Sequence, residues 1–396
     1  MRIHSICSKE EKLKAHNAPH INPIYATSAF NFESLQEGIN IFNGSEKGFV
    51  YGRFGNPNTE LLQNKLAKLE GWGLPFETRA IVTNSGMSAI SILLNTLLKP
   101  GDTLITQPAL YGGTLSLIEN YFRSNHINIL YCDLNDLVEV ENKLEQIKGN
   151  GVLFIETPAN PTLDCYDLQL LSELASQHGF LSACDNTFAS PILQQPMKQG
   201  IDYVVHSNTK YINGHGNSIS GVIVGKKSDS NMDKVFDAMK LMGANCSPFE
   251  AWLCYQGMKT MALRVQKQTS NAGKIATFLN QSPSVSVVNY PGLKKHPTHE
   301  IAQKQMKGFG GMLSFDLGSI EFGKKFIQNV KFISLAPTLG DVDTIALHPA
   351  SMSHLNMDPD KRKMLGITDG LIRMSVGIED VEDIIEDLNR ALERLS

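Results

Sequence analysis

Tyr203-Val-Val-His-Ser-Asn-Thr-Lys-Tyr211 joins a short apolar run to two hydroxyl residues and a lysine. The apolar run predicts a buried strand, and Ser207, Thr209 and Lys210 follow where that strand ends. Ligands of open parallel sheets bind at the carboxyl ends of the strands, so these three residues are candidates for a site. A lysine in such a place would by itself usually reach solvent, so the rest of the sequence has to decide its role.

Six further apolar runs of strand length lie on either side of this segment. They cover residues 80–83, 103–106, 127–131, 152–155, 180–184 and 219–224. Helical stretches, such as 88–98 and 168–178, separate most of them. Apolar strands that alternate with amphipathic helices are typical of α/β proteins, so we expect a mainly parallel seven-stranded sheet sandwiched by helices.

The pattern changes near residue 245. A helical segment over 248–279 precedes strands near 285–290, 311–316 and 372–376, and the chain closes with a helix whose apolar stripe runs from Val381 to Leu395. Residues 1–57 have no strong period. We therefore expect an N-terminal arm over 1–57, a large α/β domain over 58–245 and a smaller C-terminal α+β domain over 246–396.

The composition narrows the functional class. The chain has 396 residues, 40 acidic and 36 basic, and a net charge of −4. That balance argues against nucleic acid as a partner, because phosphate backbones select basic surfaces. No run approaches the ~20 apolar residues of a membrane span, and the first residues have no apolar signal core, so we expect no membrane partner and a cytoplasmic location. The six cysteines are scattered, which predicts reduced buried thiols and no metal site.

Two other strand ends carry groups that complement Lys210. Asn84-Ser-Gly-Met87 follows one strand and precedes a helix, which would offer backbone N–H groups to a phosphate, although an ordinary turn explains it about as well. Asp185 ends another strand, where alone it would be a helix cap. Together these groups are what pyridoxal 5'-phosphate requires: a phosphate site, a lysine that bonds the cofactor and an acid that keeps the pyridine nitrogen protonated.

Longer motifs resemble one family of pyridoxal-phosphate enzymes over about Tyr51 to Ile385. They are Tyr51-Gly-Arg-Phe-Gly-Asn-Pro57, Tyr111-Gly-Gly-Thr114, Glu156-Thr-Pro-Ala-Asn-Pro161, Val204-Val-His-Ser-Asn-Thr-Lys-Tyr-Ile-Asn-Gly-His-Gly216 and Leu371-Ile-Arg-Met-Ser-Val-Gly377. The sequence is similar here to the enzymes of cysteine and methionine metabolism, which include cystathionine γ-lyase, methionine γ-lyase, cystathionine γ-synthase and the O-acylhomoserine sulfhydrylases. The resemblance implies the aminotransferase-like architecture, fold type I, with the cofactor bound by the 58–245 domain.

The resemblance also implies a role for each candidate residue at the reaction centre. Lys210 would form the Schiff base and shuttle protons between substrate carbons. Asp185 would pair with the pyridine nitrogen. Tyr111 would stack on the cofactor ring and assist proton transfer at the leaving group. Arg373 would hold the substrate α-carboxylate with the help of Asn160.

Further residues are implied around the phosphate and the substrate. Tyr51 and Arg53 would reach the phosphate of a neighbouring subunit, which implies a homotetramer built from dimers that share active sites. Thr338 stands where the family usually has Ser in substrate alignment. Backbone or hydroxyl groups of four residues would bind the phosphate within one chain, namely Gly86, Met87, Ser207 and Thr209.

These residues imply a carbon–sulfur lyase that performs γ-elimination on L-methionine or L-cystathionine and releases 2-oxobutanoate, ammonia and a thiol. The alternative is γ-replacement on an O-acylhomoserine, catalysed by a transferase. Gly113 stands where methionine γ-lyases commonly have Cys, which weakens the methionine assignment. Asp343 stands where some cystathionine γ-lyases have Glu, and a carboxylate there would bind a distal ammonium. A non-catalytic binding protein and an aminotransferase are less consistent with Lys210, Asp185 and the quoted motifs.

Overall fold

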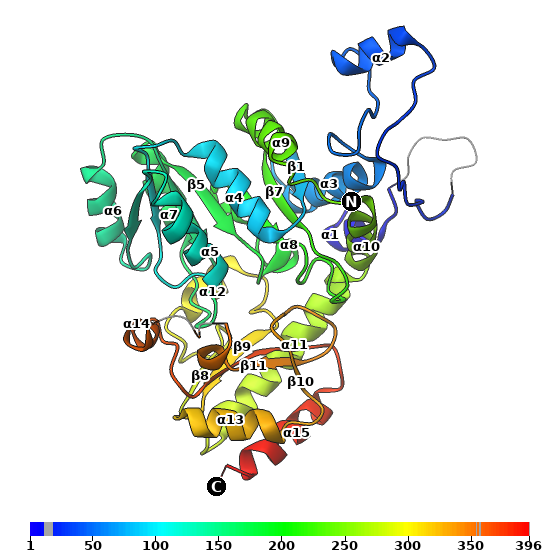
Figure 1. Ribbon diagram of the computed structural model, residues 1–396. Coiled ribbons are helices and arrows are strands. Elements are labelled where there is room, and N and C mark those ends of the chain that lie inside the picture. The colour runs from blue at the N-terminus through cyan, green and yellow to red at the C-terminus, as the bar shows by residue number, and fades with distance from the viewer. Residues whose placement is uncertain (12–18, 354, 356–357, 396) are drawn as a thin grey trace.

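The computed structural model describes residues 1–11, 19–353, 355 and 358–395. Within these residues the strands form two sheets that lie apart along the molecule (Figure 1). The larger sheet is surrounded by helices, and the smaller one lies near the C-terminal end. The functional residues discussed below come from both.

The larger sheet has the order β1-β7-β6-β5-β4-β2-β3 among the described residues. Four pairs along it are parallel, and β7 runs antiparallel to both of its neighbours. The prediction of a mainly parallel seven-stranded sheet is therefore confirmed. Its strands are β1 (Thr78–Thr83), β2 (Thr103–Thr106), β3 (Asn128–Tyr131), β4 (Gly151–Glu156), β5 (Leu181–Asp185), β6 (Tyr203–Ser207) and β7 (Gly221–Lys226).

Helices cover both faces of this sheet, because successive side chains of a strand point to opposite sides. Val204 packs in the core on one face with α3, α6 and α7, and Val205 packs on the other with α4 and α9. The helices of this region are α3 (Pro57–Glu70), α4 (Gly86–Leu97), α5 (Gly112–Leu117), α6 (Leu137–Gln146), α7 (Leu168–Gln177), α8 (Ser190–Leu193) and α9 (Asn231–Met242), with a π-helical turn at Ile118–Phe122 and a 3₁₀ turn at Pro196–Gln199.

The smaller sheet has the order β10-β11-β12-β9-β8 within the described chain. Its strands are β8 (Val287–Asn289), β9 (Met312–Asp316), β10 (Ser334–Leu335), β11 (Ile345–Leu347) and β12 (Leu371–Ser375). The long helix α11 contacts β8, β9 and α15, and α13 packs against α15 and β12. The helix α10 (Pro248–Met258) packs against α3 and leads into α11. The helices of the region of the smaller sheet are α11 (Met261–Gln281), α12 (His299–Gln305), α13 (Ile320–Asn329), α14 (Pro359–Met364) and α15 (Val381–Glu393), with a 3₁₀ turn at Pro349–Ser351.

The start of α3 shows how local sequence sets an element. The side chain of Asn56 accepts the N–H of Asn58 at 2.9 Å, and Pro57 takes the first helical position, where its missing N–H costs nothing. The leucines that follow at helical spacing are all buried against the sheet, namely Leu61, Leu62, Leu66 and Leu69. The helix α3 therefore begins where its capping residue places it.

The single helical segment expected over 248–279 is wrong, because it is two helices that break at Lys259 and Thr260. The carbonyl of Gly257 accepts a hydrogen bond from the side chain of Arg264 at 2.9 Å. A side-chain donor thus takes one of the last carbonyls of α10, and the chain turns before α11 begins. The spacing of apolar residues in the sequence does not reveal this contact, so it could not predict the break.

Only part of the N-terminal stretch extends away from both sheets (Figure 1). The helix α1 (Ile3–Ser8) packs against α3, whereas α2 (Leu35–Phe42) lies at the tip of an extended stretch (Figure 1). Leu35 is 83% exposed and Phe42 is 66% exposed, although both are large and apolar. Nothing among the described residues of this chain covers that apolar side of α2.

Asp387 provides a test of how α15 is held in place. This residue is 2% exposed, and its carboxylate accepts the backbone N–H groups of Lys331, Phe332 and Ile333 at 2.9–3.0 Å. We expect Asp387→Asn to lower the free energy of unfolding by about 2–3 kcal/mol, because one of the two acceptor oxygens and the charge that pairs with Arg390 are lost. Urea unfolding followed by circular dichroism measures the change. The neighbouring exposed Glu386→Gln is the control, and equal midpoints for the two variants would contradict this expectation.

Candidate active site

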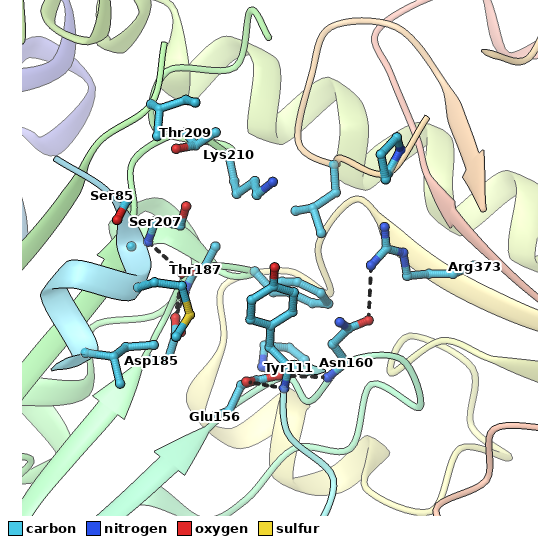
Figure 2. Close-up of a pocket in the computed structure, with 18 residues that line it drawn as sticks. Ser85, Tyr111, Glu156, Asn160, Asp185, Thr187, Ser207, Thr209, Lys210 and Arg373 are labelled. Carbon is cyan, nitrogen blue, oxygen red and sulfur yellow. Dashed lines mark hydrogen bonds between the residues drawn. The ribbon is translucent and has the colours of Figure 1, made fainter. Parts of the chain in front are cut away.

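A cavity of about 240 Å³ opens between the carboxyl ends of β4, β5 and β6, the start of α4 and the smaller sheet (Figure 2). Nine of the candidate residues line it. The lining residues are Ser85, Gly86, Met87, Ile90, Tyr111, Glu156, Pro158, Asn160, Asp185, Thr187, Phe188, Ser207, Thr209, Lys210, Ile219, Pro337, Leu339 and Arg373.

The start of α4 forms an anion-binding end of the cavity. Ser85 caps the helix by accepting the N–H of Ser88 at 3.1 Å. The N–H groups of Gly86 and Met87 are the first two of the helix and have no intrahelical partner, so they are free to bind an anion. A Cβ atom on Gly86 would lie 2.6 Å from Cβ of Ser207, so only glycine lets the Ser207 hydroxyl approach these N–H groups.

Asp185 lies at the end of β5 with its carboxylate held from one side. Thr187 donates both its N–H, at 3.0 Å, and its hydroxyl, at 2.5 Å, to Oδ1 of Asp185. The same hydroxyl accepts the N–H of Ser207 at 2.9 Å. Burial raises the pKa of Asp185, so a cation bound at this carboxylate would be favourable. The protonated nitrogen of a pyridine ring is such a cation.

Lys210 projects into the cavity from the loop after β6 (Figure 2). Its Nζ donates a hydrogen bond to Oγ1 of Thr338 at 3.1 Å. Burial, and then the positive charge of Arg373, lower the pKa of Lys210 to about 8. About a tenth of the lysine is then neutral at pH 7, which makes it a competent nucleophile and proton acceptor.

Arg373 is a buried cation on β12. Its guanidinium donates to Oδ1 of Asn160 at 3.3 Å and to the carbonyl of Thr338 at 3.1 Å. No carboxylate of the described chain forms an ion pair with it, and burial lowers its pKa to about 10. An arginine that is buried with only carbonyl acceptors is suited to a carboxylate ligand, which it can bind through two parallel bonds.

Tyr111 stands at the mouth of the cavity, where it precedes α5 and is 48% exposed. A Cβ atom on Gly113 would lie 2.6 Å from Cε1 of Tyr111 and 3.1 Å from the sulfur of Met87. The glycine that the sequence suggested as a marker of substrate choice is therefore required, in this arrangement, by the position of the tyrosine ring.

Other candidates lie outside the cavity of this chain. Tyr51 is 43% exposed, and Arg53 donates to the carbonyl of Lys240 at 2.6 Å. Thr338 is not among the lining residues, but it contacts both Lys210 and Arg373. Asp343 is exposed and does not line the cavity.

Three polar lining residues had no role in the sequence-based prediction. They are Ser85, Thr187 and Glu156. Glu156 stood inside a quoted motif and ends an apolar strand in the same way as Asp185, which is the signal that could have identified it. Burial, followed by the charge of Asp185, raises the pKa of Glu156 to about 8.

The residues present fit pyridoxal phosphate. Gly86 and Met87 offer N–H groups for its phosphate, Asp185 offers an acid for its ring nitrogen, and Lys210 offers an amine for its aldehyde. In the described ranges, no three or more His, Cys, Asp or Glu side chains gather to hold a metal ion, and no helix is long and apolar enough to cross a membrane.

Comparisons with known proteins agree with pyridoxal phosphate as the cofactor. The family model "Cys/Met metabolism PLP-dependent enzyme" matches residues 3–393. L-methionine γ-lyase of Fusobacterium nucleatum subsp. polymorphum is 45% identical over 375 residues, which are 94% of this chain and 93% of that protein. The structure of cystathionine γ-synthase from Xanthomonas oryzae pv. oryzae is 34% identical, with a TM-score of 0.91 over 100% of this chain and 98% of that one. The metY structure of Campylobacter jejuni carries N'-pyridoxyl-lysine-5'-monophosphate; it is 30% identical, with a TM-score of 0.92 over 99% of this chain and 100% of that one.

The lowered pKa of Lys210 leads to a test that needs no substrate. In cofactor-free protein, reductive methylation of Lys210 should rise with pH around a midpoint of about 8, because only the neutral amine reacts. Peptide mass spectrometry measures the modified fraction at each pH. In Arg373→Leu the midpoint should move up, since a neighbouring positive charge is lost. A midpoint near that of an ordinary lysine, about 10.4, in the unaltered protein would contradict the assignment.

Proposed function

The chain belongs to the Cys/Met metabolism family of pyridoxal-phosphate-dependent enzymes, and on that basis we propose that it is a carbon–sulfur lyase that performs γ-elimination on L-methionine or L-cystathionine. The products are 2-oxobutanoate, ammonia and a thiol. The observation that carries the proposal is the pair formed by Lys210 and Arg373: an amine with a pKa of about 8 faces a buried arginine that lacks a carboxylate partner. An amino-acid carboxylate held at Arg373 would bring its α-carbon toward the amine.

In this proposal one set of residues holds the cofactor. Gly86, Met87, Ser207 and Thr209 bind its phosphate, Tyr111 covers its ring, and Asp185 holds a proton on its pyridine nitrogen. The bound cofactor withdraws electrons from the substrate, which lowers the cost of removing protons next to the amino carbon. Lys210 fixes the cofactor before each turnover.

A second set of residues handles the substrate. Arg373 binds the α-carboxylate, and Asn160 and the Thr338 carbonyl orient the guanidinium. Lys210 accepts the proton of the α-carbon and moves protons between substrate carbons. Thr338 orients the Lys210 amine through its hydroxyl. Tyr111 gives a proton to the sulfur that leaves.

The walls of the cavity favour L-methionine over L-cystathionine. The charged side chains of the lining are Lys210, Arg373, Asp185 and Glu156, and the lining also has an apolar part that includes Ile219, Pro337 and Leu339. A methyl thioether would contact this wall without cost, whereas the distal ammonium and carboxylate of cystathionine would need polar partners. Asp343, which could have bound that ammonium, is outside the lining.

The second candidate is γ-replacement on an O-acylhomoserine, as in a cystathionine γ-synthase or an O-acylhomoserine sulfhydrylase. The similarity to the cystathionine γ-synthase structure of Xanthomonas oryzae pv. oryzae favours it. Lys210, Tyr111 and Arg373 would have the same roles. The product would depend on whether a thiol or water reacts with the substrate after its γ-substituent has left.

We further propose the assembly and location of the enzyme. Residues 1–57 would form an arm to a neighbouring subunit, followed by the cofactor domain (58–245) and the C-terminal domain (246–396). Tyr51 and Arg53 would serve the partner's phosphate site, and the apolar side of α2, with Leu35 and Phe42 exposed, would be covered in the assembly. Dimers that share sites would pair into a homotetramer. Six buried free cysteines suit the reducing cytoplasm.

A product assay distinguishes the two reactions. Purified protein should absorb visible light through its bound cofactor, and L-methionine should give 2-oxobutanoate and methanethiol without any added thiol. L-cystathionine and O-succinylhomoserine with cysteine are supplied in parallel. Lys210→Ala should lose at least about 10³-fold in kcat, because it lacks the amine. Formation of cystathionine as the main product would favour the second candidate, and an unaltered protein with neither reaction would refute the proposal.

Shared active sites are tested by mixing two inactive variants. Lys210→Ala keeps Arg53, and Arg53→Ala keeps Lys210. After subunit exchange, a hybrid dimer would contain one site with both residues intact, so activity should return to about a quarter of the unaltered level. Each variant refolded alone is the control. Mixtures that stay as inactive as the separate variants would show that Arg53 serves its own chain or no site.

A further inference from the structure

Glu156 is a buried acid of the cavity to which the reaction outlined above assigns no role. It is the last residue of β4 and only 5% exposed. Its Oε2 accepts the N–H of Tyr111 at 2.9 Å, and its Oε1 accepts the N–H of Asn160 at 3.1 Å (Figure 2). One carboxylate thus holds the backbone of two residues that lie on opposite sides of it in the sequence.

The backbone of Glu156 is itself fixed. Gln107, which is fully buried at the end of β2, donates to the Glu156 carbonyl at 2.6 Å and accepts the Glu156 N–H at 3.3 Å. The backbone that carries the carboxylate is therefore anchored to the sheet, and the carboxylate ties the backbones of Tyr111 and Asn160 to this anchored position.

The two held residues face the substrate region from different directions. Tyr111 stands at the mouth, and the Asn160 side chain accepts from Arg373 at 3.3 Å. A continuous series of hydrogen bonds thus connects the tyrosine, through Glu156 and Asn160, to the arginine (Figure 2). This series sets how far the proton donor for a leaving group lies from the site of an α-carboxylate.

We propose that Glu156 is a positioning residue, whose carboxylate fixes the spacing between the proton-transferring Tyr111 and the carboxylate-binding Arg373. The inference rests on the proposed function, because the spacing matters only when a substrate spans it. Tyr111 and Arg373 touch the substrate in that proposal, and Glu156 acts through them.

The charge of Glu156 matters for this role. A carboxylate can accept both N–H groups, whereas a protonated acid turns one oxygen into a hydroxyl and weakens that acceptor. The ionisable groups around it are Asp185, its register neighbour on β5, the buried Cys184 and Tyr166, and, across the cavity, Tyr111, Lys210 and Arg373. Burial and then Asp185 raise the pKa of Glu156 to about 8, and a cation bound to Asp185 would oppose the second cause. The carboxylate form of Glu156, which can hold both N–H groups, is therefore formed as pH rises and lost as pH falls.

The test compares Glu156→Gln with Glu156→Asp in the cofactor-loaded enzyme. Glutamine keeps the size but offers one acceptor oxygen, and its NH₂ faces an N–H group. We expect kcat/KM for L-methionine to fall about 10- to 100-fold, because reacting groups shift out of line. Binding of L-norleucine, which has the α-carboxylate but no leaving group, should weaken in parallel when followed through the cofactor absorbance. The low-pH fall of kcat that protonation of Glu156 causes should be absent in the glutamine variant and retained in the aspartate variant.

Asp387→Asn is the matched control, since it also removes a buried carboxylate that accepts backbone N–H groups, but far from the cavity. It should lower stability and leave kcat, norleucine affinity and the pH profile unchanged. A double-mutant cycle with Tyr111→Phe, which keeps the backbone N–H, should show non-additive losses.

If Glu156→Gln retains the kcat, norleucine affinity and pH profile of the unaltered enzyme, the inference is overturned. If it does not fold, a Glu156→Asp variant with unchanged kcat/KM and unchanged norleucine affinity would overturn it as well. An unaltered enzyme that turns over no sulfur amino acid would instead overturn the proposed function, and norleucine binding would still report on Glu156.

Discussion

The parallel pairing of β4, β5 and β6 is the constraint on which the rest of the site depends. It sets Glu156 beside Asp185 and Asp185 beside Val205, so that two acids and the lysine loop after β6 meet at one edge of the sheet. Charges at a buried edge are costly without partners. The neighbouring polar groups supply them: Thr187 for Asp185, and the N–H groups of Tyr111 and Asn160 for Glu156.

The site also requires that the two sheets keep fixed positions relative to each other. Arg373 on β12 and Thr338 beside it bring groups of the smaller sheet to Lys210 and Asn160 of the larger one. Arg264 of α11 strengthens this relation, because its guanidinium donates to the carbonyls of residues 211, 212 and 213, directly after the lysine. A Cβ atom on Gly214 would overlap this guanidinium, and the residue has a φ of +68°, so glycine is required there.

The sequence predicted the structure best where a short segment, taken alone, has the pattern of a strand. All strands of the larger sheet could be located from apolar runs, and Lys210, Asp185 and Gly86 could be identified because each follows such a run. Residues whose roles depend on partners that are distant in the sequence could not be identified in the same way. Glu156 binds backbone N–H groups, which every sequence has, and the break after α10 depends on a contact from Arg264. Tyr51 and Arg53 lie outside the cavity of their own chain, and their role depends on an assembly that one chain cannot display.

The two cations of the cavity are coupled electrostatically. Lys210 and Arg373 lie close enough for the arginine to lower the pKa of the lysine. A carboxylate that binds to Arg373 offsets its charge and removes that cause. Burial alone would then act on the lysine, so its pKa would rise. In the proposed function, binding of the carboxylate would therefore change the pKa of the base, and this coupling depends on the position that Asn160 and Thr338 set for the guanidinium.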